Sequence, residues 1–239
     1  MDAATRLRGC LLAGAVGDAL GSPLEFHTRA EIERRWGRGG PTRFVDGSWP
    51  AGSITDDTQM NLFTAEGMIR ARRRMAHDPD VDPVPFVHRA YLRWLHTQAY
   101  EVDASLLDGW LVEQRVLHAR RAPGNTCLSG LTADRMGTAD TPLNGSKGCG
   151  TVMRMAPAAL WDHVADGPDA FSQACAYGAL THGHPTGYLA GGALAAMIAM
   201  LLRGEPQDAS VGAAVQSLKR HAGAEGREVL DAIVRATNL

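Results

Sequence analysis

The segment TDDTQMNLFTAEGMIRARRR, residues 55–74, predicts a helix whose two ends are both marked in the sequence. Thr55, Asp56 and Asp57 are residue types that cap a helix N-terminus, where they accept hydrogen bonds from free N–H groups. The arginines from Arg70 to Arg74 place cations at the last turn, where they suit the helix dipole. We therefore expect a helix that starts after an irregular, glycine-marked loop and ends at the arginine cluster.

Similar patterns along the rest of the chain predict an all-α protein. Alanine and glycine are frequent, runs of β-branched residues are few, and no segment alternates between apolar and polar residues. The first helix should span residues 5–20 and stop at Gly21-Ser22-Pro23. Its second half holds mostly small residues that allow another backbone to approach closely, so we expect this helix to be central. Further helices are expected at residues 84–98, 104–121, 126–135, 187–203, 208–221 and 225–236, with Pro157 and Pro168 in the first turns of others.

Composition narrows the class of protein. The 239 residues, 45% hydrophobic and 21% charged, suit one globular domain spanning residues 1–239. A formal net charge of −2 gives no reason to expect a nucleic-acid partner. Four widely separated cysteines argue against a zinc site or a disulfide framework and fit the cytoplasm. The most apolar stretch, residues 188–202, is shorter than the ~20 residues that span a bilayer, so we expect a buried helix and no membrane segment.

The tetrapeptide from Thr55 to Thr58 also offers chemistry. Two adjacent carboxylates beside two hydroxyls are the hard oxygen donors that Mg2+ or Mn2+ prefers. A junction between loop and helix can aim such groups at a pocket. On the tetrapeptide alone, helix capping is the better explanation. Asp18, near the end of the first helix, is either a buried hydrogen-bonded acid or a site residue.

Three other segments are candidates for a ligand site. The stretch NGSKGCGT, residues 144–151, is a glycine-rich loop whose N–H groups can hold phosphate oxygens, although it matches no Walker A or Rossmann pattern and an ordinary connection is the alternative. Glu25 follows the first helix and is either a catalytic acid or base or a solvated residue. His182 and His184 lie at a helix end, where a role beside the ligand is favoured over metal binding.

Taken in order, these segments resemble the ADP-ribosylglycohydrolase family. The matching pieces are Gly14-x-x-Gly17-Asp18-Ala19-Leu20-Gly21-x-Pro23-x-Glu25, Thr55-Asp56-Asp57-Thr58-x-Met60, Asn144-Gly145-Ser146-x-Gly148-x-Gly150, Met153-Arg154-x-Ala156-Pro157 and Thr181-His182. The resemblance spans residues 8 to about 202. It implies an orthogonal all-α fold in one domain, with the ligand cleft among loops and helix ends and with two divalent cations, usually Mg2+ and in some members Mn2+.

The resemblance also implies roles for individual residues. Metal ligands would be Thr55, Asp56 and Asp57, and Glu25 would be an acid on a mobile loop, so Glu25 and Asp57 are the catalytic candidates. His182 would contact the ligand. The expected ADP-ribose-binding loop comprises Asn144, Gly145, Ser146, Gly148, Cys149 and Gly150. The reaction would be hydrolysis of the bond between ribose C1″ and an acceptor on a protein or small molecule, through an oxocarbenium-like transition state.

The sequence departs from the family in one respect. The family carries an Asp-x-Asp-Thr or Asp-x-Asp-Ser motif near its C-terminus that helps to hold both cations. The nearest patterns here, Asp78-Pro79-Asp80 and Asp80-Val81-Asp82, lie too early and lack the hydroxyl partner. We therefore expect a member without its C-terminal portion, with weak or no metal binding and activity by itself, unless another chain supplies that segment.

Two alternatives follow from that departure. One is a catalytically impaired helical module that binds ADP-ribose or a partner. The other is a purely structural subunit in which residues 55–58 serve only as a cap. The acceptor stays open among ADP-ribosyl-arginine, ADP-ribosyl-serine, a nucleic-acid end and a free metabolite.

Overall fold

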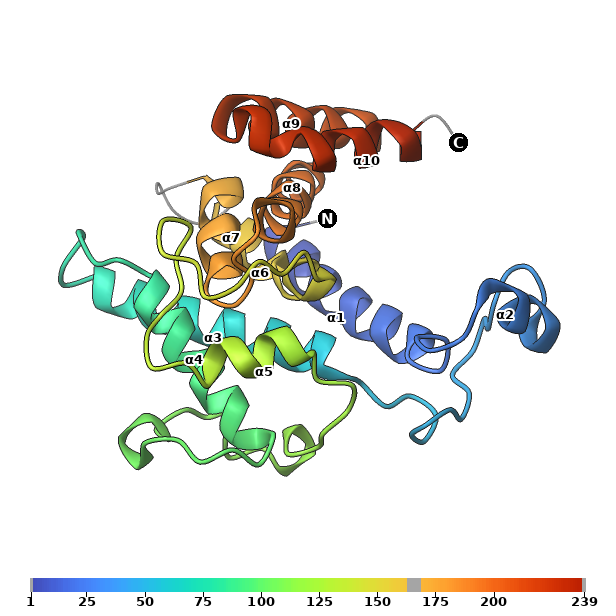
Figure 1. Ribbon diagram of the computed structural model, residues 1–239, viewed down its shortest axis with the longest axis horizontal. Coiled ribbons are helices and arrows are strands. Elements are labelled where there is room, and N and C mark those ends of the chain that lie inside the picture. Colours follow the sequence, from blue (N-terminus) through green and yellow to red (C-terminus); the bar gives the residue numbers. More distant parts are fainter. Residues whose placement is uncertain (1, 163–168, 238–239) are drawn as a thin grey trace.

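A computed structural model describes residues 2–162 and 169–237, and within those ranges it contains helices and no strand (Figure 1). The all-α prediction is therefore confirmed. The α-helices are α1 (Ala3–Gly21), α2 (Arg29–Trp36), α3 (Asp56–Met75), α4 (Val84–Thr97), α5 (Asn125–Leu131), α6 (Ala156–Asp162), α7 (Ala170–Ala179), α8 (Pro185–Arg203), α9 (Gln207–His221) and α10 (Arg227–Thr237). Short 3-10 helices are η1 (Ala104–Leu106), η2 (Arg115–Leu117), η3 (Cys149–Arg154) and η4 (Gly223–Gly226).

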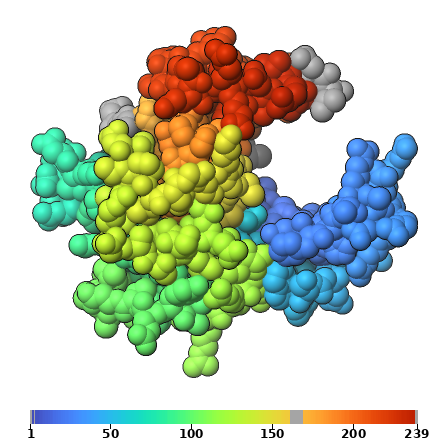
Figure 2. All heavy atoms as spheres, in the orientation of Figure 1, coloured from blue at the N-terminus to red at the C-terminus, as the bar shows by residue number. Residues whose placement is uncertain are grey.

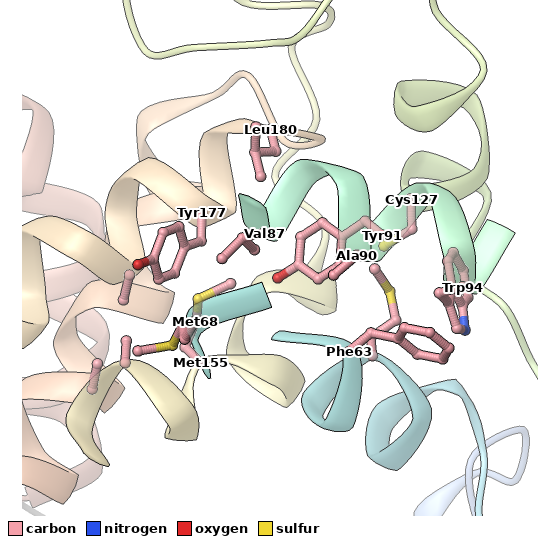
Figure 3. Packing of buried hydrophobic residues seen from close by; sticks show 14 of the residues in the cluster. Phe63, Met68, Val87, Ala90, Tyr91, Trp94, Cys127, Met155, Tyr177 and Leu180 are labelled. Carbon is pink, nitrogen blue, oxygen red and sulfur yellow. The ribbon is translucent and has the colours of Figure 1, made fainter. Parts of the chain in front are cut away.

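Helix α3 begins and ends where its sequence predicts. The Thr55 side chain caps it by accepting a hydrogen bond from the Asp57 N–H, and three arginines occupy its last turn. Its apolar face packs against α4, where Tyr91 and Trp94 are fully buried. Figure 3 shows these side chains meeting Phe63 and Met68 of α3, with Tyr177 of α7 on the far side. Burial of large side chains at about 1.5–3 kcal/mol each makes this cluster the main source of stability.

Helix α8 lies between α7 and α9 and is the most apolar helix of the described chain. Its length and composition would allow it to cross a bilayer, but 56% of its most apolar window is buried against other helices. Gly192 permits the close packing of α8 on α7, because a Cβ there would collide with the Cys175 Sγ and the Phe171 carbonyl. A core helix is therefore the better description of α8, in agreement with the sequence.

The expectation that the first helix is central is wrong for the described chain. Helix α1 contacts α3, α6 and α8 along one side only. Leu12 is 67% exposed and Val16 46% exposed, and a Cβ at Gly14 or Gly17 would meet no atom within 4 Å. With α2 it forms an arm beside the helical body (Figure 1), and Figure 2 shows an open notch between this arm and the C-terminal helices.

The helix predicted at residues 104–121 is also wrong, because only η1 and η2 form there. Side chains of α3 and α4 take the backbone groups that a helix would have used. The Leu111 N–H donates to Glu66 Oε1 at 3.3 Å, and the Asp108 carbonyl accepts from Arg70 at 2.7 Å. Gly109 lies so close to the buried Glu66–Arg93 ion pair that any side chain would collide with it.

Smaller differences concern element ends. The helix expected at residues 126–135 is only α5, and the segment after Cys149 is a 3-10 helix. Helix α2 was not predicted, although Thr28 and Glu31 form a capping box at its start. Pro157 lies in the first turn of α6, as expected, and Pro168 lies outside the described residues.

Candidate metal and ligand site

Asp18 organises the start of α3. Its Oδ2 accepts from the Thr55 N–H at 2.8 Å and from the Thr58 N–H at 3.2 Å, and both threonine hydroxyls also donate to its carboxylate. Of the two roles left open by the sequence, the geometry therefore gives Asp18 the hydrogen-bonded one. Because Asp18 satisfies the residues on both sides of the Asp56-Asp57 pair, it fixes where that pair can point.

The Asp56 and Asp57 carboxyls lie in a poorly solvated setting. Asp56 is 3% exposed and accepts one hydrogen bond, from the Gly124 N–H at 3.1 Å. Burial raises its pKa to about 7, helped by the charges of Asp57, Glu25 and Asp18 and opposed by the Gly124 bond. Burial, with the charges of Asp18 and Glu25, raises the pKa of Asp57 to about 6. Crowded carboxyls of this kind are common at functional sites.

Glu25 lies on the turn that follows α1 and is exposed. Partial loss of solvent around its carboxyl, followed by the charge of Asp18, raises its pKa. Its own charge in turn acts on both Asp56 and Asp57. The turn therefore brings Glu25 into the electrostatic neighbourhood of the pair, which is where the sequence expected a catalytic acid.

These four acids lack a counter-charge, since none forms an ion pair within residues 2–162 and 169–237. Across the same residues, no three His, Cys, Asp or Glu side chains converge closely enough to hold a metal ion. The donors that are present are hard oxygens, and repulsion among them would be relieved by a cation. The set suits Mg2+ or Mn2+ in chemistry but would need further ligands from water or another segment.

The first turn of α5 connects this cluster to the glycine-rich loop. Gly124 binds Asp56 through its N–H, and two residues later the Thr126 hydroxyl lies 3.0 Å from the Ser146 hydroxyl. Cys127 lies next to both parts, because a Cβ at Gly124 would stand 3.8 Å from its Sγ and a Cβ at Gly150 would stand 3.1 Å from it. The structure thus brings residues 55–57 and residues 144–150 together around one short element.

Asn144 shapes the loop. Its amide nitrogen donates to the Thr181 carbonyl at 2.8 Å, and its Oδ1 accepts from the N–H groups of Ser146 at 3.0 Å and Gly183 at 3.1 Å. The Ser146 hydroxyl then accepts from the Gly148 N–H at 3.2 Å. The polar atoms of Asn144 are therefore engaged in holding the loop, while Gly145 and Cys149 are exposed on its outer surface.

His182 lies beneath the loop and is only 1% exposed. Its ring fits there because residues 148 and 150 are glycines, whose Cβ atoms would stand 3.1 and 3.2 Å from Nε2. Burial, followed by the charge of Arg154, lowers the pKa of His182 to about 3, so the imidazole is neutral. In this structure His182 supports the loop from below.

Sequence reasoning missed several residues of this arrangement. Gly124 and Cys127 were given no role at the site, Thr126 entered only as the start of an expected helix, and Thr181 appeared only as part of the family resemblance. Arg154 appeared only as part of the family resemblance, yet it is fully buried and contacts Thr181, Cys127 and the Tyr91 ring. The signal for Arg154 was a charged residue in an otherwise apolar segment, because such a residue is seldom buried without a specific role.

Comparison with known proteins shows the family of the chain. The family model described as ADP-ribosylglycohydrolase matches residues 1–239. The chain is 32% identical to the ADP-ribosyl-[dinitrogen reductase] glycohydrolase of Rhodospirillum rubrum over 188 residues, covering 75% of this chain and 52% of the relative. It is 26% identical to the ADP-ribosylarginine hydrolase Tri1 of Pseudomonas putida (strain GB-1) over 220 residues, covering 91% and 52%. A shorter match, 41% over 69 residues, covers 28% of this chain and 18% of Tri1 from Serratia proteamaculans (strain 568).

The chain thus spans about half the length of the Rhodospirillum and Pseudomonas relatives. The family model, in contrast, accounts for the sequence from end to end. By that match and by the identity to the Rhodospirillum protein, the chain belongs to the ADP-ribosylglycohydrolase family.

Proposed function

We propose that this chain forms the ADP-ribose-binding part of a hydrolase that cleaves the bond between ribose C1″ and an acceptor atom. Family membership supports the reaction class. The observation that carries the proposal is the shared position of the two candidate subsites. The N–H of Gly124 binds Asp56, and Thr126 binds Ser146, so the oxygen cluster and the glycine-rich loop lie on either side of one helix start.

We propose two Mg2+ ions as the cofactor of the complete site, with Mn2+ as the alternative, held in part by Thr55, Asp56 and Asp57. The Thr55 hydroxyl donates a hydrogen bond to Asp18 and accepts one from the Asp57 N–H, which leaves one oxygen lone pair available for a cation. When bound, the cations would polarise and orient the ribose hydroxyls and a water molecule. The raised pKa values of Asp56 and Asp57 support a cation at this place, because a positive charge would favour their ionised forms.

The residues of the chain would divide the remaining work. Residues 144–150 and His182 would hold the ADP-ribose moiety, and Asp57 would orient the water that adds to C1″. In hydrolysis the water oxygen bonds to C1″ and a proton passes to the departing acceptor atom. Glu25 is the group we propose for moving that proton, because its raised pKa suits an acid and it lies on a turn beside the pair.

For the acceptor we propose ADP-ribosylarginine. Two relatives carry the name ADP-ribosylarginine hydrolase. A guanidinium leaving group would also enter a neighbourhood of acids that have no cationic partner in the described chain, and guanidinium pairs well with carboxylates. The free state of all four cysteines supports a cytoplasmic location.

A second function, an ADP-ribose-binding or partner-binding module without turnover, is favoured by the incomplete ligand set. The described residues place no third acidic or imidazole ligand beside Asp56 and Asp57. We propose that full activity requires further oxygen donors from a segment or chain that packs on the open face of α1. Leu12 and Val16 leave an apolar surface on one side of this helix, and its opposite side lines a hollow that reaches Asp18 and Asp57.

Calorimetric titrations with Mg2+ and with ADP-ribose, together with an assay on an ADP-ribosylated arginine peptide, test these readings. The wild-type chain is compared with Asp56→Ala, Asp57→Ala and, as a surface control, Asp134→Ala. Mg2+-dependent release of ADP-ribose that is lost in Asp57→Ala supports the hydrolase. ADP-ribose binding that survives Asp57→Ala without any turnover supports the module. Binding of neither ligand overturns both the hydrolase and the module proposals. Robust turnover by the chain alone refutes the proposal that the site needs further oxygen donors.

A further inference from the structure

Arg154 is a fully buried cation that forms no ion pair with an acid among residues 2–162 and 169–237. Its exposed fraction is 0%, and its guanidinium lies 4.7 Å from the centre of the Tyr91 ring. Nη1 donates to the Cys127 sulfur at 3.0 Å and Nη2 donates to the Thr181 hydroxyl at 2.6 Å. Burying an arginine without a carboxylate is unfavourable, so we looked for a role in the contacts that it makes.

The contacts of Arg154 lead directly to the loop histidine. The Thr181 hydroxyl that accepts the hydrogen bond from Arg154 lies 2.8 Å from His182 Nδ1. A guanidinium can only donate, so the Thr181 oxygen is an acceptor toward Arg154 and its own hydrogen remains available. Thr181 is 0% exposed, which rules out water as the acceptor of that hydrogen.

Two acceptors are within reach of the Thr181 hydrogen: the ring nitrogen of His182 and the sulfur of Cys127. Sulfur is a weak acceptor and already receives the Arg154 Nη1 proton. Donation to His182 Nδ1 is therefore preferred. The opposite arrangement, with a proton on Nδ1, would deprive the buried hydroxyl of its best acceptor.

We propose that Arg154 is a positioning residue for the ligand loop. Through Thr181 it fixes His182 as the neutral imidazole that carries its proton on Nε2. Nε2 makes no hydrogen bond within the described residues and faces the backbone of Gly148 and Gly150. The chain of contacts thus presents one N–H donor, of defined orientation, to the loop that the proposed function assigns to ADP-ribose. The inference rests on that proposed function only for the identity of the ligand.

The tautomer is directly measurable. Long-range 1H–15N spectra of the uniformly 15N-labelled full chain distinguish a protonated from an unprotonated ring nitrogen, and the His182 signals are those missing from His182→Gln. We expect a protonated Nε2 and an unprotonated Nδ1 between pH 6 and 8. A protonated Nδ1, or an imidazolium, in the wild-type chain overturns the proposal. This readout needs no substituted arginine, so it holds even if Arg154 variants fail to fold.

Two pairs of substitutions test the links. Thr181→Val removes the hydroxyl and should give a mixture of tautomers, whereas Thr181→Ser should retain the wild-type one. Arg154→Met should likewise give a mixture of the two His182 tautomers, and Arg154→Lys should keep a larger fraction protonated on Nε2. An unchanged tautomer in folded Thr181→Val or Arg154→Met refutes the proposal, with thermal unfolding as the check on folding.

Titration with ADP-ribose separates this inference from the proposed function. Thr181→Val should weaken binding about tenfold, which corresponds to ~1.4 kcal/mol, while Thr181→Ser stays near the wild-type value. A wild-type chain with the expected tautomer but no ADP-ribose binding refutes the proposed function and leaves the Arg154 arrangement standing. Binding that is equal in Thr181→Val and Thr181→Ser shows that the tautomer does not position the loop, and overturns the inference.

Discussion

Asp18 holds Thr55 by two hydrogen bonds, from the Thr55 N–H to Oδ2 at 2.8 Å and from the Thr55 hydroxyl to Oδ1 at 2.7 Å. These bonds join the end of α1 to the start of α3 across 37 residues of sequence. The carboxylate thereby does for the α3 N-terminus what water would do in an isolated helix. It also aims the two aspartates that follow.

Replacing Asp18 by Asn should destabilise the protein and weaken metal binding together. Asn has only one acceptor oxygen, so at least one of the four donors now satisfied by Asp18 loses its partner and faces an amide NH2 group. We expect a loss of about 2 kcal/mol in the free energy of unfolding, because bonds to a charged acceptor contribute about 1.5–3 kcal/mol. Urea unfolding measures it, with the exposed Asp134→Asn as the control. A loss below that of the control contradicts the organising role of Asp18.

Stability of the metal-free chain should depend on pH through Asp56. Its pKa rises from an ordinary 3.8 to about 7 on folding, so the folded state binds a proton more tightly than the unfolded state. The resulting penalty is absent below about pH 4, grows as pH rises, and is complete above about pH 7. Asp56→Asn removes the ionisation yet keeps an oxygen for the Gly124 N–H. It should therefore be more stable than wild type at pH 7.5, by up to about 4 kcal/mol, and similar near pH 4.

Chemical unfolding in EDTA across this pH range measures that difference. A gap between Asp56→Asn and wild type that stays constant from pH 4 to 7.5 would show that the Asp56 carboxyl is not perturbed. Saturating Mg2+ should close the gap at pH 7.5, since a bound cation favours the ionised carboxylate of the wild type and the variant has lost that ligand.

Gly183→Ala and Gly145→Ala form a matched pair in the ligand-loop region. A Cβ at Gly183 would overlap the Asn144 carbonyl oxygen, whereas a Cβ at Gly145 meets no atom within 4 Å. We expect Gly183→Ala to cost more than about 2 kcal/mol and to abolish ADP-ribose binding, because the Asn144 bond to the Gly183 N–H cannot survive. Gly145→Ala should change the free energy of unfolding by less than about 0.5 kcal/mol. Equal thermal midpoints for the two variants would show that Asn144 does not pack here.

The open face of α1 gives a fourth prediction. Leu12→Glu should leave the stability of the isolated chain within about 0.5 kcal/mol of wild type, because Leu12 is 67% exposed. Val87→Glu, at a fully buried position on α4, is the contrasting variant and should unfold the chain. Circular dichroism melting compares them. A large loss of stability in Leu12→Glu would place this side chain in a core and contradict the exposed arm.

Elements with local signals could be predicted from the sequence, and contacts between distant segments could not. Both ends of α3 were predictable because capping residues and arginines act within one turn. The helix prediction for residues 104–121 was wrong because no local sequence pattern reveals that Gly109 lies against Glu66 and Arg93. The composition of α1 is typical of a buried helix, and its exposed position depends on which segments are present to cover it.

The same distinction applies to the site. Residues 55–57 and 144–150 were identified from their chemistry and the family resemblance, and the structure brings them together. Their connection through Gly124 and Thr126 was not visible, because glycine and threonine at a helix start are ordinary in sequence. The roles of Arg154 and Thr181 depend on their contact in the folded chain. The two residues are 27 positions apart in sequence, so no local pattern reveals this contact.

The placement of Asp18 on α1 links the surface of this helix to the Asp56-Asp57 pair. Helix α1 exposes Leu12 and Val16 to solvent, and near its end the Asp18 carboxylate binds Thr55 and Thr58. Any molecule that binds to this face of α1 would shift or immobilise the helix. Through Asp18, that change would alter the position of the Asp56-Asp57 pair without a rearrangement of the core. Under the proposed function, binding of a molecule to α1 and the position of the aspartate pair would then be coupled through this helix.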